Sequence, residues 1–365
     1  MVIEPDRIER ILIRGTNWVG DAVMSVPAMR EIRRRFPKSC ISLLVRPWVK
    51  DIYSGARFLD EVIGFDRSAE HRGFSGRRRL VSELRIRRFD LAILFQNAFE
   101  AALLTWWAGI PLRVGYARDG RSMLLSHAIP IDPEARKAHQ VYYYLGILSG
   151  AGLAEPQPWR NPAQNLSCDL EVQDSDRQAA RSLLRLHGVD AGEPLIGLNP
   201  GASYGGAKRW LPDRFAEVAD YLHAKHHARA ILLGSATELP IARHVASMMR
   251  SSAVNLAGET TLGQLMGVIS ECTLLITNDS GPMHLAAALS VPQVAVFGST
   301  SDVATGPLSS VAEVVRVPAE CSPCFLRECP TDFRCMIGIT VGHVIEAAER
   351  RLSEAERGRR RDGGK

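Results

Sequence analysis

The sequence predicts an α/β protein built from two Rossmann-like, doubly wound domains that face each other across a cleft. The chain has 365 residues, which is more than one compact core usually holds. Hydrophobic residues make up 46% of the chain, enough to fill two cores. In both halves short apolar strands alternate with amphipathic helices, the pattern of parallel sheets covered by helices.

The predicted elements follow this alternation along the chain. In the first half, residues 10–14 are predicted to form a strand, and residues 22–36 a helix because apolar residues recur at helical spacing from Val23 to Ile32. Further strands are predicted at residues 41–45 and 90–94. In the second half the predicted strands are residues 195–198, 230–233, 274–276 and 293–297.

A domain boundary is predicted near the middle of the chain. Residues 155–169 contain three prolines and little periodicity, which indicates a linker. We therefore expect an N-terminal domain at residues 1–160 and a C-terminal domain at residues 161–345. Residues 346–365 are expected to hold the end of a final helix and a basic tail that is disordered from residue 357 onward.

The charge is distributed unevenly. Residues 1–160 carry 25 Lys and Arg against 17 Asp and Glu, whereas residues 161–365 carry 20 against 23. The first half, with its run Arg77, Arg78 and Arg79, is therefore suited to an anionic partner, although a solvated helix face explains that run equally well. The interleaved basic and aromatic residues typical of nucleic-acid readers are absent, which argues against nucleic acid.

Hydrophobic segments indicate where the protein acts. No run approaches the roughly 18 apolar residues needed to span a bilayer. The charged N-terminus has no apolar signal segment. We therefore expect a cytoplasmic protein without a transmembrane segment.

The most informative segment is residues 277–289, where a strand runs into a polar turn and a helix begins at once. Free amides and the helix dipole at that point favour a bound anion such as phosphate. Asp279 can accept hydrogen bonds from sugar hydroxyls, while Ser280, His284 and the Gly281 amide can face a diphosphate. The segment thus has the pattern of a nucleotide-sugar site. The alternative is a turn capped by Asp279 or Ser280.

Three further loops follow predicted strands. Residues 14–21 contain two glycines and lead to Asp21 at a helix start, where a capping role is the alternative; the glycine spacing is not that of a dinucleotide site. Residues 199–210 are glycine-rich and can cradle a diphosphate, which Lys208 can neutralise unless it is merely a solvated cation. The G-K-[ST] of ATP-hydrolysing loops is missing. Glu238 can bind ribose hydroxyls or simply occupy a first helical turn.

Together these segments resemble a known family, the ADP-heptose:lipopolysaccharide heptosyltransferases. The resemblance is carried, in the same order and over most of residues 8–350, by NWVGDAVMSVPAMREIRRRFP, NPGASYGGAKRWLPDRFAEVA and NDSGPMHLAAALSVPQVAVFGSTS. The pair NWVGD and AKRW is most similar to the group of lipopolysaccharide heptosyltransferases II. The resemblance implies a glycosyltransferase B fold, with an acceptor domain, an ADP-heptose domain and a final helix near residues 341–356 that packs back toward the first domain.

The same resemblance implies roles for individual residues. Asp21 is then the catalytic base, and Lys208 acts on the leaving group. The donor is bound by two phosphate-binding residues, one ribose-binding residue, one residue beside the adenine and four that hold heptose and phosphate: Ser203, Lys208, Glu238, Thr260, Asp279, Ser280, Gly281 and His284. The residues expected to contact the acceptor are Asn17, Trp18, Arg77, Arg78 and Arg79.

The implied activity is inverting transfer of L-glycero-D-manno-heptose from ADP-heptose onto heptosyl-Kdo-lipid A in lipopolysaccharide inner-core synthesis. The enzyme is then expected to work as a peripheral protein on the anionic inner leaflet of the inner membrane of a Gram-negative bacterium. Catalysis is expected to need no cofactor, because Lys208 and helix-end amides can stabilise the departing ADP. The alternatives are another sugar-nucleotide transferase of the same fold, a non-catalytic nucleotide-sugar binding protein and an epimerase.

Four of the seven cysteines lie in one short segment: Cys321, Cys324, Cys329 and Cys335. In a reducing compartment such clustering indicates metal more often than disulfides. Two thiolate pairs can close a structural zinc or iron site, and free thiols or a redox-dependent loop are the alternatives. We expect loss of such a metal to loosen this segment without disturbing Asp21 or Lys208.

Overall fold

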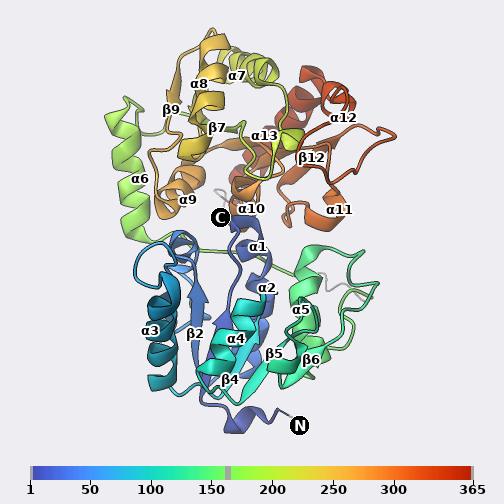
Figure 1. Ribbon diagram of the computed structural model, residues 1–365. Coiled ribbons are helices and arrows are strands. Elements are labelled where there is room, and N and C mark those ends of the chain that lie inside the picture. Colours follow the sequence, from blue (N-terminus) through green and yellow to red (C-terminus); the bar gives the residue numbers. More distant parts are fainter. Residues whose placement is uncertain (1–2, 161–165, 363–365) are drawn as a thin grey trace. The chain divides into compact units, whose positions relative to one another are not determined.

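The computed structural model describes residues 3–160 and 166–362. The chain divides into two compact units, Met1–Cys168 and Asp169–Lys365. Each unit is built on a parallel six-stranded sheet with helices on both faces (Figure 1). The predicted linker at residues 155–169 includes residues 161–165, which lie outside the described residues.

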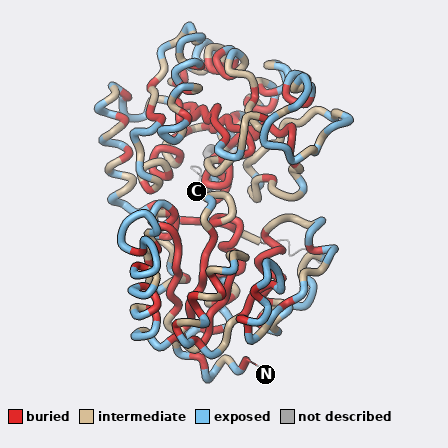
Figure 2. Tube along the Cα trace, viewed as in Figure 1, coloured by how far each residue is buried: buried red, intermediate tan, exposed pale blue. Residues whose placement is uncertain are grey.

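The sheet of the first unit has the strand order β3-β2-β1-β4-β5-β6, and all its strand pairs are parallel. Its central strands are continuous apolar runs because helices bury both of their faces; Figure 2 shows them as buried. The strands are β1 (Arg10–Arg14), β2 (Cys40–Val45), β3 (Glu61–Gly64), β4 (Leu91–Leu94), β5 (Leu112–Tyr116) and β6 (His127–Ile129).

Two layers of helices enclose this sheet. One core joins Leu12, Leu44 and Leu94 of the strands to Leu80 and Leu104, so α3 (Gly73–Ile86) and α4 (Phe99–Trp107) cover the same face. On the other side α5 packs against both α1 and α2. The remaining elements are α1 (Val19–Met24), α2 (Val26–Arg35), α5 (Gln140–Gly150) and the 3-10 turns η1 (Pro5–Arg7), η2 (Pro47–Tyr53) and η3 (Ser122–Leu124).

The helix predicted over residues 22–36 is in fact two helices that meet at Ser25. The break is due to Pro27, which has no amide hydrogen and therefore starts a helix more readily than it continues one. The Ser25 hydroxyl donates a hydrogen bond of 2.8 Å to the carbonyl of Ala22. The first helix begins at Val19, so Asp21 lies in its first turn and Trp18 holds the N-cap position.

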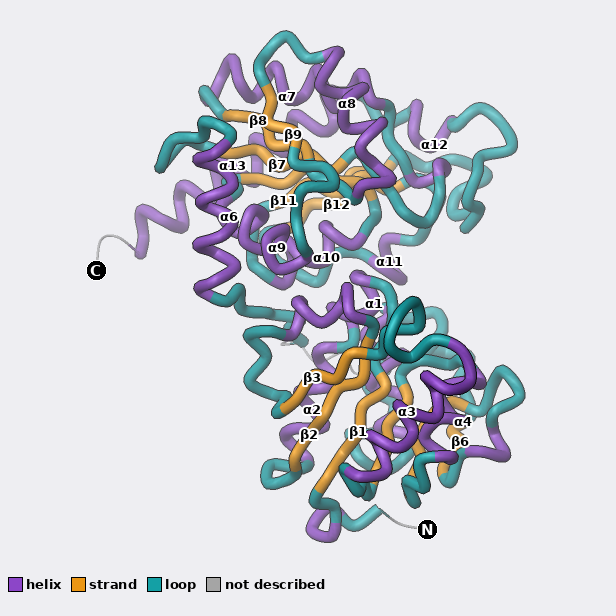
Figure 3. Tube along the Cα trace, turned by 60° about the vertical axis from the view of Figure 1, so that its left-hand side comes forward, coloured by secondary structure: helices purple, strands orange, loops and turns teal. Residues whose placement is uncertain are grey.

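The second unit repeats the topology, with strand order β12-β11-β10-β7-β8-β9 and all pairs parallel. Figure 3 shows its strands in orange among helices in purple. In each sheet the first strand lies beside the fourth, the arrangement of a doubly wound nucleotide-binding fold. The strands are β7 (Leu195–Asn199), β8 (Arg229–Leu232), β9 (Ala253–Asn255), β10 (Leu274–Asn278), β11 (Gln293–Phe297) and β12 (Ala312–Arg316).

Helices again form two layers. One face of the sheet is covered by α7 (Pro212–His226), α8 (Leu239–Met248) and α13 (Val341–Asp362), which share a core with the strands. The opposite face carries α10 (Gly281–Ala288), which contacts α9 (Leu262–Glu271), and α9 packs along α6 (Asp174–Leu186). The shorter elements are α11 (Asp302–Thr305), α12 (Arg334–Ile337) and the 3-10 turns η4 (Gly206–Lys208) and η5 (Ala236–Glu238).

The last helix is longer than the sequence analysis expected. A disordered tail was predicted from residue 357, but α13 continues to Asp362. The added residues are mainly arginine, a good helix former, and they extend a helix already nucleated on the core through Val344 and Ala348. Residues 363–365 lie outside the described residues. Within the described part of the chain, no helix combines the length and apolar character that crossing a membrane requires.

Candidate active site

The first unit has a cavity of about 490 Å³ where its strand order reverses, between β1 and β4. Ligands of doubly wound sheets bind at this position, outside the carboxyl ends of the strands. The cavity is lined by residues after β1, β4, β5 and β6 and by α5: Thr16, Asn17, Trp18, Asp21, Phe95, Gln96, Asn97, Arg118, Arg136, Gln140, Tyr143 and Tyr144. The predicted residues Asn17, Trp18 and Asp21 thus lie together, whereas Arg77, Arg78 and Arg79 lie on α3 and do not line this cavity.

Tyr144 fixes the carboxylate of Asp21. Its hydroxyl donates a hydrogen bond of 2.8 Å to Asp21 Oδ1, and its ring is buried. Burial, followed by the charge of Asp21, raises the pKa of Tyr144 well above its ordinary value. The phenol therefore stays protonated and acts as a donor that orients Asp21. No sequence motif marks this tyrosine, which is 123 residues from Asp21 along the chain and was not predicted as a site residue.

Two buried arginines hold the loops around this cavity. Arg14 donates to Asn17 Oδ1 at 3.3 Å and to the Leu44 carbonyl at 3.0 Å. Burial, and then the nearby Arg46, lower the pKa of Arg14 to about 9, so it remains charged at neutral pH. Arg121 donates to Asn97 Oδ1 at 3.1 Å and also to the Gln96 carbonyl. These contacts join the loops after β1 and β4 to the body of the unit.

In the second unit the strand order reverses between β7 and β10, and asparagine side chains connect the loops after these strands. Asn199 Nδ2 donates to Thr277 Oγ1 at 3.0 Å and to Ser280 Oγ at 2.8 Å. Asn278 Nδ2 donates to the Pro200 carbonyl at 2.9 Å, and Asn278 Oδ1 accepts from the amide of Trp210 at 2.9 Å. The two loops predicted to bind the donor are therefore held as one surface.

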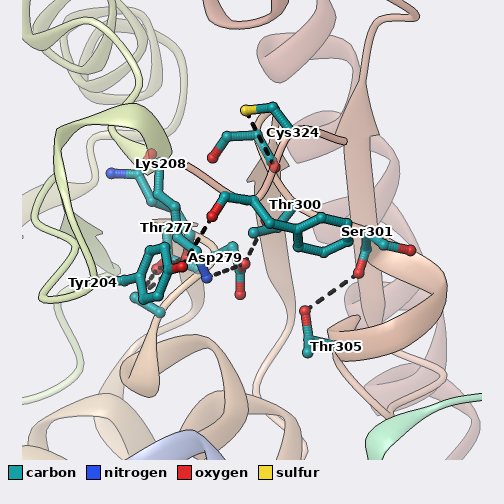
Figure 4. A network of polar contacts seen from close by, with 12 residues as sticks. Tyr204, Lys208, Thr277, Asp279, Thr300, Ser301, Thr305 and Cys324 are labelled. Atoms are coloured by element: carbon teal, nitrogen blue, oxygen red, sulfur yellow. Dashed lines mark hydrogen bonds and ion pairs between the residues drawn. The ribbon is translucent and has the colours of Figure 1, made fainter. Parts of the chain in front are cut away.

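A buried ion pair lies at the centre of this surface (Figure 4). Lys208 Nζ is 2.5 Å from Asp279 Oδ2, and the Thr300 hydroxyl donates to the same oxygen at 2.6 Å. Only 5% of the Asp279 side chain and 14% of the Lys208 side chain are exposed. The ammonium group also lies 4.9 Å from the centre of the Tyr204 ring. Lys208 is thus not a solvated loop cation.

The start of α10 is open to an anion. Ser280 holds the N-cap position without capping the helix through its side chain. Its hydroxyl is instead bonded to Asn199 and the Asn278 carbonyl. The amide of Gly281 is therefore not used by a side-chain cap and can face a ligand, whereas Pro282 in the next position has no amide hydrogen. His284 is buried in the same helix.

The remaining predicted donor residues lie on neighbouring loops. Glu238 Oε2 accepts from the Ser235 amide and hydroxyl, both at 2.8 Å, in a capping box. Glu238 also packs against Gly201, where a Cβ would come within 2.3 Å of Oε1. Its helix-capping role is therefore realised in the structure. Ser203 is exposed in the loop after β7, and Thr260 is half-buried between β9 and α9.

The cysteine-rich segment, residues 321–335, packs against the loop after β7, which we call the donor loop. The amide of Ala207 donates to the Arg327 carbonyl at 2.9 Å, and the Tyr204 hydroxyl donates to the Phe325 carbonyl at 2.9 Å. The segment therefore contacts the loop that carries Lys208, which argues against the sequence expectation that loosening the segment leaves Lys208 undisturbed. The contacts join loops that lie far apart along the chain, and no local pattern reveals them.

Among the described residues, one group of potential ligand side chains lies close enough together to hold a metal ion, and it does not include the cysteines. All four thiols are free, and no three of their sulfur atoms lie within 4.8 Å of one another. The group is Glu70, His71 and Glu83. There the amide of Asp66 donates to His71 Nδ1 at 3.1 Å, so the proton of the neutral ring is on Nε2, which faces Glu83. That nitrogen has no lone pair for a metal.

A larger hollow, of about 660 Å³, lies elsewhere in the second unit. Its lining includes Pro194 and Leu195, at the beginning of β7. It is therefore at the amino edge of the sheet, away from the loops described above. We assign the chemistry to the carboxyl edge, where the charged groups converge.

Lys208→Ala should lower both stability and affinity for ADP. The substitution leaves the buried Asp279 carboxylate without its cation, which should cost about 3 kcal/mol of unfolding free energy. The double variant Lys208→Ala, Asp279→Asn should recover much of that stability, because no charge remains buried, yet still bind ADP weakly. Denaturant unfolding and calorimetry measure the two effects. Wild-type ADP affinity in a folded double variant would place Lys208 outside the donor site.

Comparison with known proteins gives consistent results across both units. A family model described as glycosyltransferase family 9 (heptosyltransferase) matches residues 77–333. Lipopolysaccharide heptosyltransferase 2 of Salmonella typhimurium is 33% identical over 318 residues, which cover 84% of this chain and 88% of that protein. The Escherichia coli protein of the same name is 32% identical over 317 residues, with the same shares covered.

Solved structures show the same fold. The structure of E. coli ADP-heptose lps heptosyltransferase II has a TM-score of 0.80 at 30% sequence identity, covering 95% of this chain and 99% of that one. A glycosyl transferase family 9 structure from Veillonella parvula has a TM-score of 0.83 at 24% identity, covering 97% and 99%.

Proposed function

Because this chain belongs to glycosyltransferase family 9, the heptosyltransferases, we propose that it transfers heptose from ADP-heptose onto heptosyl-Kdo-lipid A in the synthesis of the lipopolysaccharide inner core. The predicted family, the glycosyltransferase activity and the glycosyltransferase B fold are confirmed by these similarities. A non-catalytic binding protein or an epimerase is not favoured. The observation that carries the donor assignment is the polar surface around Lys208, Asp279 and the open start of α10.

The donor is proposed to bind with its diphosphate at Lys208, Ser203 and the Gly281 amide at the start of α10. Positive charge at these points stabilises the ADP that leaves in the transition state, which is the role that metal ions have in other transferases. Asp279 accepts hydrogen bonds from heptose hydroxyls, and His284 contacts the phosphates. Glu238 and Thr260 are proposed to contact ribose and adenine. On this view the second unit is the donor domain, and catalysis needs no cofactor.

Asp21 is proposed as the base that acts on the acceptor, and the first unit as the acceptor domain. The acceptor hydroxyl attacks the anomeric carbon while the bond from that carbon to the β-phosphate oxygen breaks, and the hydroxyl proton passes to Asp21. One displacement with no protein nucleophile inverts the anomeric configuration. Asn17 and Trp18, which line the same cavity, are proposed to contact the acceptor sugars.

The direct test is mass spectrometry of heptosyl-Kdo-lipid A after incubation with ADP-heptose. One added heptose is expected with the wild type. Asp21→Asn keeps the size of the side chain but removes its basicity, so transfer should fall roughly 100-fold or more. ADP affinity should stay within a few-fold, because Asp21 belongs to the other unit. No added heptose with the wild type would reject the proposed acceptor, and transfer at the wild-type rate by Asp21→Asn would reject the base.

Tyr144→Phe tests how Asp21 is positioned. Without the phenolic donor the carboxylate is less well oriented and easier to protonate. We expect kcat to fall roughly tenfold and the acid limb of the pH–rate profile to move to higher pH. Tyr142→Phe on the same helix is the matched control. An unshifted profile in Tyr144→Phe would show that the 2.8 Å contact has no part in the reaction.

We also propose that the cysteine-rich segment binds one structural zinc or iron ion. Four thiolates are a donor set that suits either metal. Since no three sulfur atoms converge within 4.8 Å, a metal would have to draw the segment together. Cys321, Cys324, Cys329 and Cys335 would be the ligands, and the ion would supply only structural support.

Elemental analysis of protein purified without chelator should then find close to one metal ion per chain. Cys324→Ser should lose the ion and lower the melting temperature by roughly 5 °C. Because the segment contacts Ala207 and Tyr204, ADP affinity should fall as well. Cys40→Ser, in the first unit, should change neither property. Metal-free wild-type protein of undiminished stability would identify the four cysteines as free thiols.

A further inference from the structure

The outer side of α4 in the first unit is unusually apolar. Ala101, Ala102 and Leu104 face the core, and yet Phe99 and Trp106 on the opposite side are 45% and 51% exposed. Packing of α4 on the sheet does not account for these exposed aromatic side chains, because they lie on the side of the helix that faces away from the core. Large apolar side chains on the solvent side of a helix usually indicate an interaction surface.

Aromatic residues of the neighbouring helix α3 extend this surface. Phe74, at the start of α3, is 69% exposed, and its ring centre lies 5.7 Å from that of Trp107 on α4. The two helices lie side by side on one face of the sheet. The aromatic residues of the two helices therefore meet at Phe74 and Trp107, and Phe99 and Trp106 are exposed on the same helix as Trp107. We refer to these aromatic residues as one patch.

Arginines surround the patch with little compensation by carboxylates. Arg78, Arg79 and Arg85 are exposed on α3, whose outer side is visible in Figure 2. Arg85 donates to the Trp107 carbonyl at 2.7 Å, which holds its guanidinium group beside the aromatic residues. The surface thus combines exposed aromatic rings with exposed cations.

These two helices carry two carboxylates, one of which is engaged by other arginines. Glu100 pairs with Arg67 at 3.3 Å and Arg77 at 2.7 Å. Glu83 is 33% exposed and lies 3.7 Å from His71 Nε2, too far for a hydrogen bond, so its carboxylate offsets at most one of the three exposed arginines. Exposed arginines are therefore left to attract an external anion. We name the set Phe74, Arg78, Arg79, Arg85, Phe99 and Trp106 the α3–α4 face.

We propose that the α3–α4 face docks on a bilayer that contains anionic phospholipid. Tryptophan and phenylalanine favour the boundary between headgroups and acyl chains, and arginines beside them pair with lipid phosphates. The charge favours a lipid surface over a second copy of this chain, since two such faces would place like charges opposite each other. The inference builds on the proposed function, whose acceptor is anchored in a membrane.

Vesicle flotation tests the proposal. Wild-type protein should bind vesicles of phosphatidylglycerol and phosphatidylcholine at least tenfold more tightly than vesicles of phosphatidylcholine alone. Added salt should weaken the binding. Arg78→Gln with Arg79→Gln should weaken it roughly 30-fold at low salt. Arg35→Gln with Arg243→Gln removes the same charge from exposed arginines elsewhere and should have a much smaller effect.

The aromatic residues are tested by Phe74→Ser with Trp106→Ser. This variant should bind anionic vesicles at least tenfold more weakly but retain its salt dependence, because the arginines remain. The control Leu186→Ser with Met248→Ser alters exposed apolar side chains of the second unit and should bind like the wild type. Unfolding curves establish that all variants are folded.

Three outcomes would overturn the proposal: equal binding to both kinds of vesicle, wild-type binding by the aromatic variant, or a lipid-independent dimer that the aromatic variant abolishes. Heptose transfer to a deacylated, water-soluble acceptor separates this proposal from the proposed function. The aromatic variant should catalyse that transfer at the wild-type rate. If the wild type itself fails to do so while still binding vesicles, the proposed function fails and the docking surface stands.

Discussion

The ion pair between Lys208 and Asp279 organises the loops of the second unit. Asp279 follows β10 and Lys208 lies in the loop after β7, and Thr300, after β11, shares the same carboxylate oxygen. Three adjacent strands are thereby connected at their carboxyl ends through one buried atom. Burying such a pair is costly unless each partner is fully bonded, so the loops can be close together only when all three contacts form. The donor surface is a cooperative unit for this reason.

In the first unit, buried cations connect the loops at the carboxyl ends of the strands. Arg14 and Arg121 donate to carbonyls and amide oxygens of the strand-end loops, and Tyr144 then orients Asp21 within the cavity so formed. Part of the positive charge of the first half is therefore structural and hidden from any partner. Other arginines, on α3, are exposed beside aromatic side chains. The structure thus shows where exposed positive charge of the first half lies, which the net charge alone does not reveal.

The local sequence pattern was sufficient to predict the central strands of both sheets, but it failed for the edge strands and for β5. The predicted strands correspond to β1, β2, β4, β7, β8, β10 and β11, which are apolar runs. The prediction missed five strands: the edge strands β3, β6, β9 and β12, and β5 beside β6. The edge strands are mostly half-buried, and three of them have only three or four residues, so little distinguishes them from loops. In the site, the motifs identified Asp21, Lys208 and Asp279. Thr300 lies in the third of the resembling segments, but nothing in the sequence assigns it a role. Tyr144 carries no motif, and only tertiary packing brings the two side chains to Asp279 and Asp21.

The glycine-rich loop after β7 shows why neighbouring segments matter to the donor site. A loop that presents its amides to phosphates must be nearly free of side chains, and such a loop has few contacts of its own and loses much entropy on ordering. In this protein, contacts with the cysteine-rich segment order the loop. The backbone of Arg327 lies so close to Gly205 that a Cβ there would come within 2.2 Å of its carbonyl oxygen, and the Ala207 amide donates to the same oxygen. The rigidity of the donor loop therefore depends on the cysteine-rich segment, and any change of thiol or metal state in that segment acts on donor binding through these contacts.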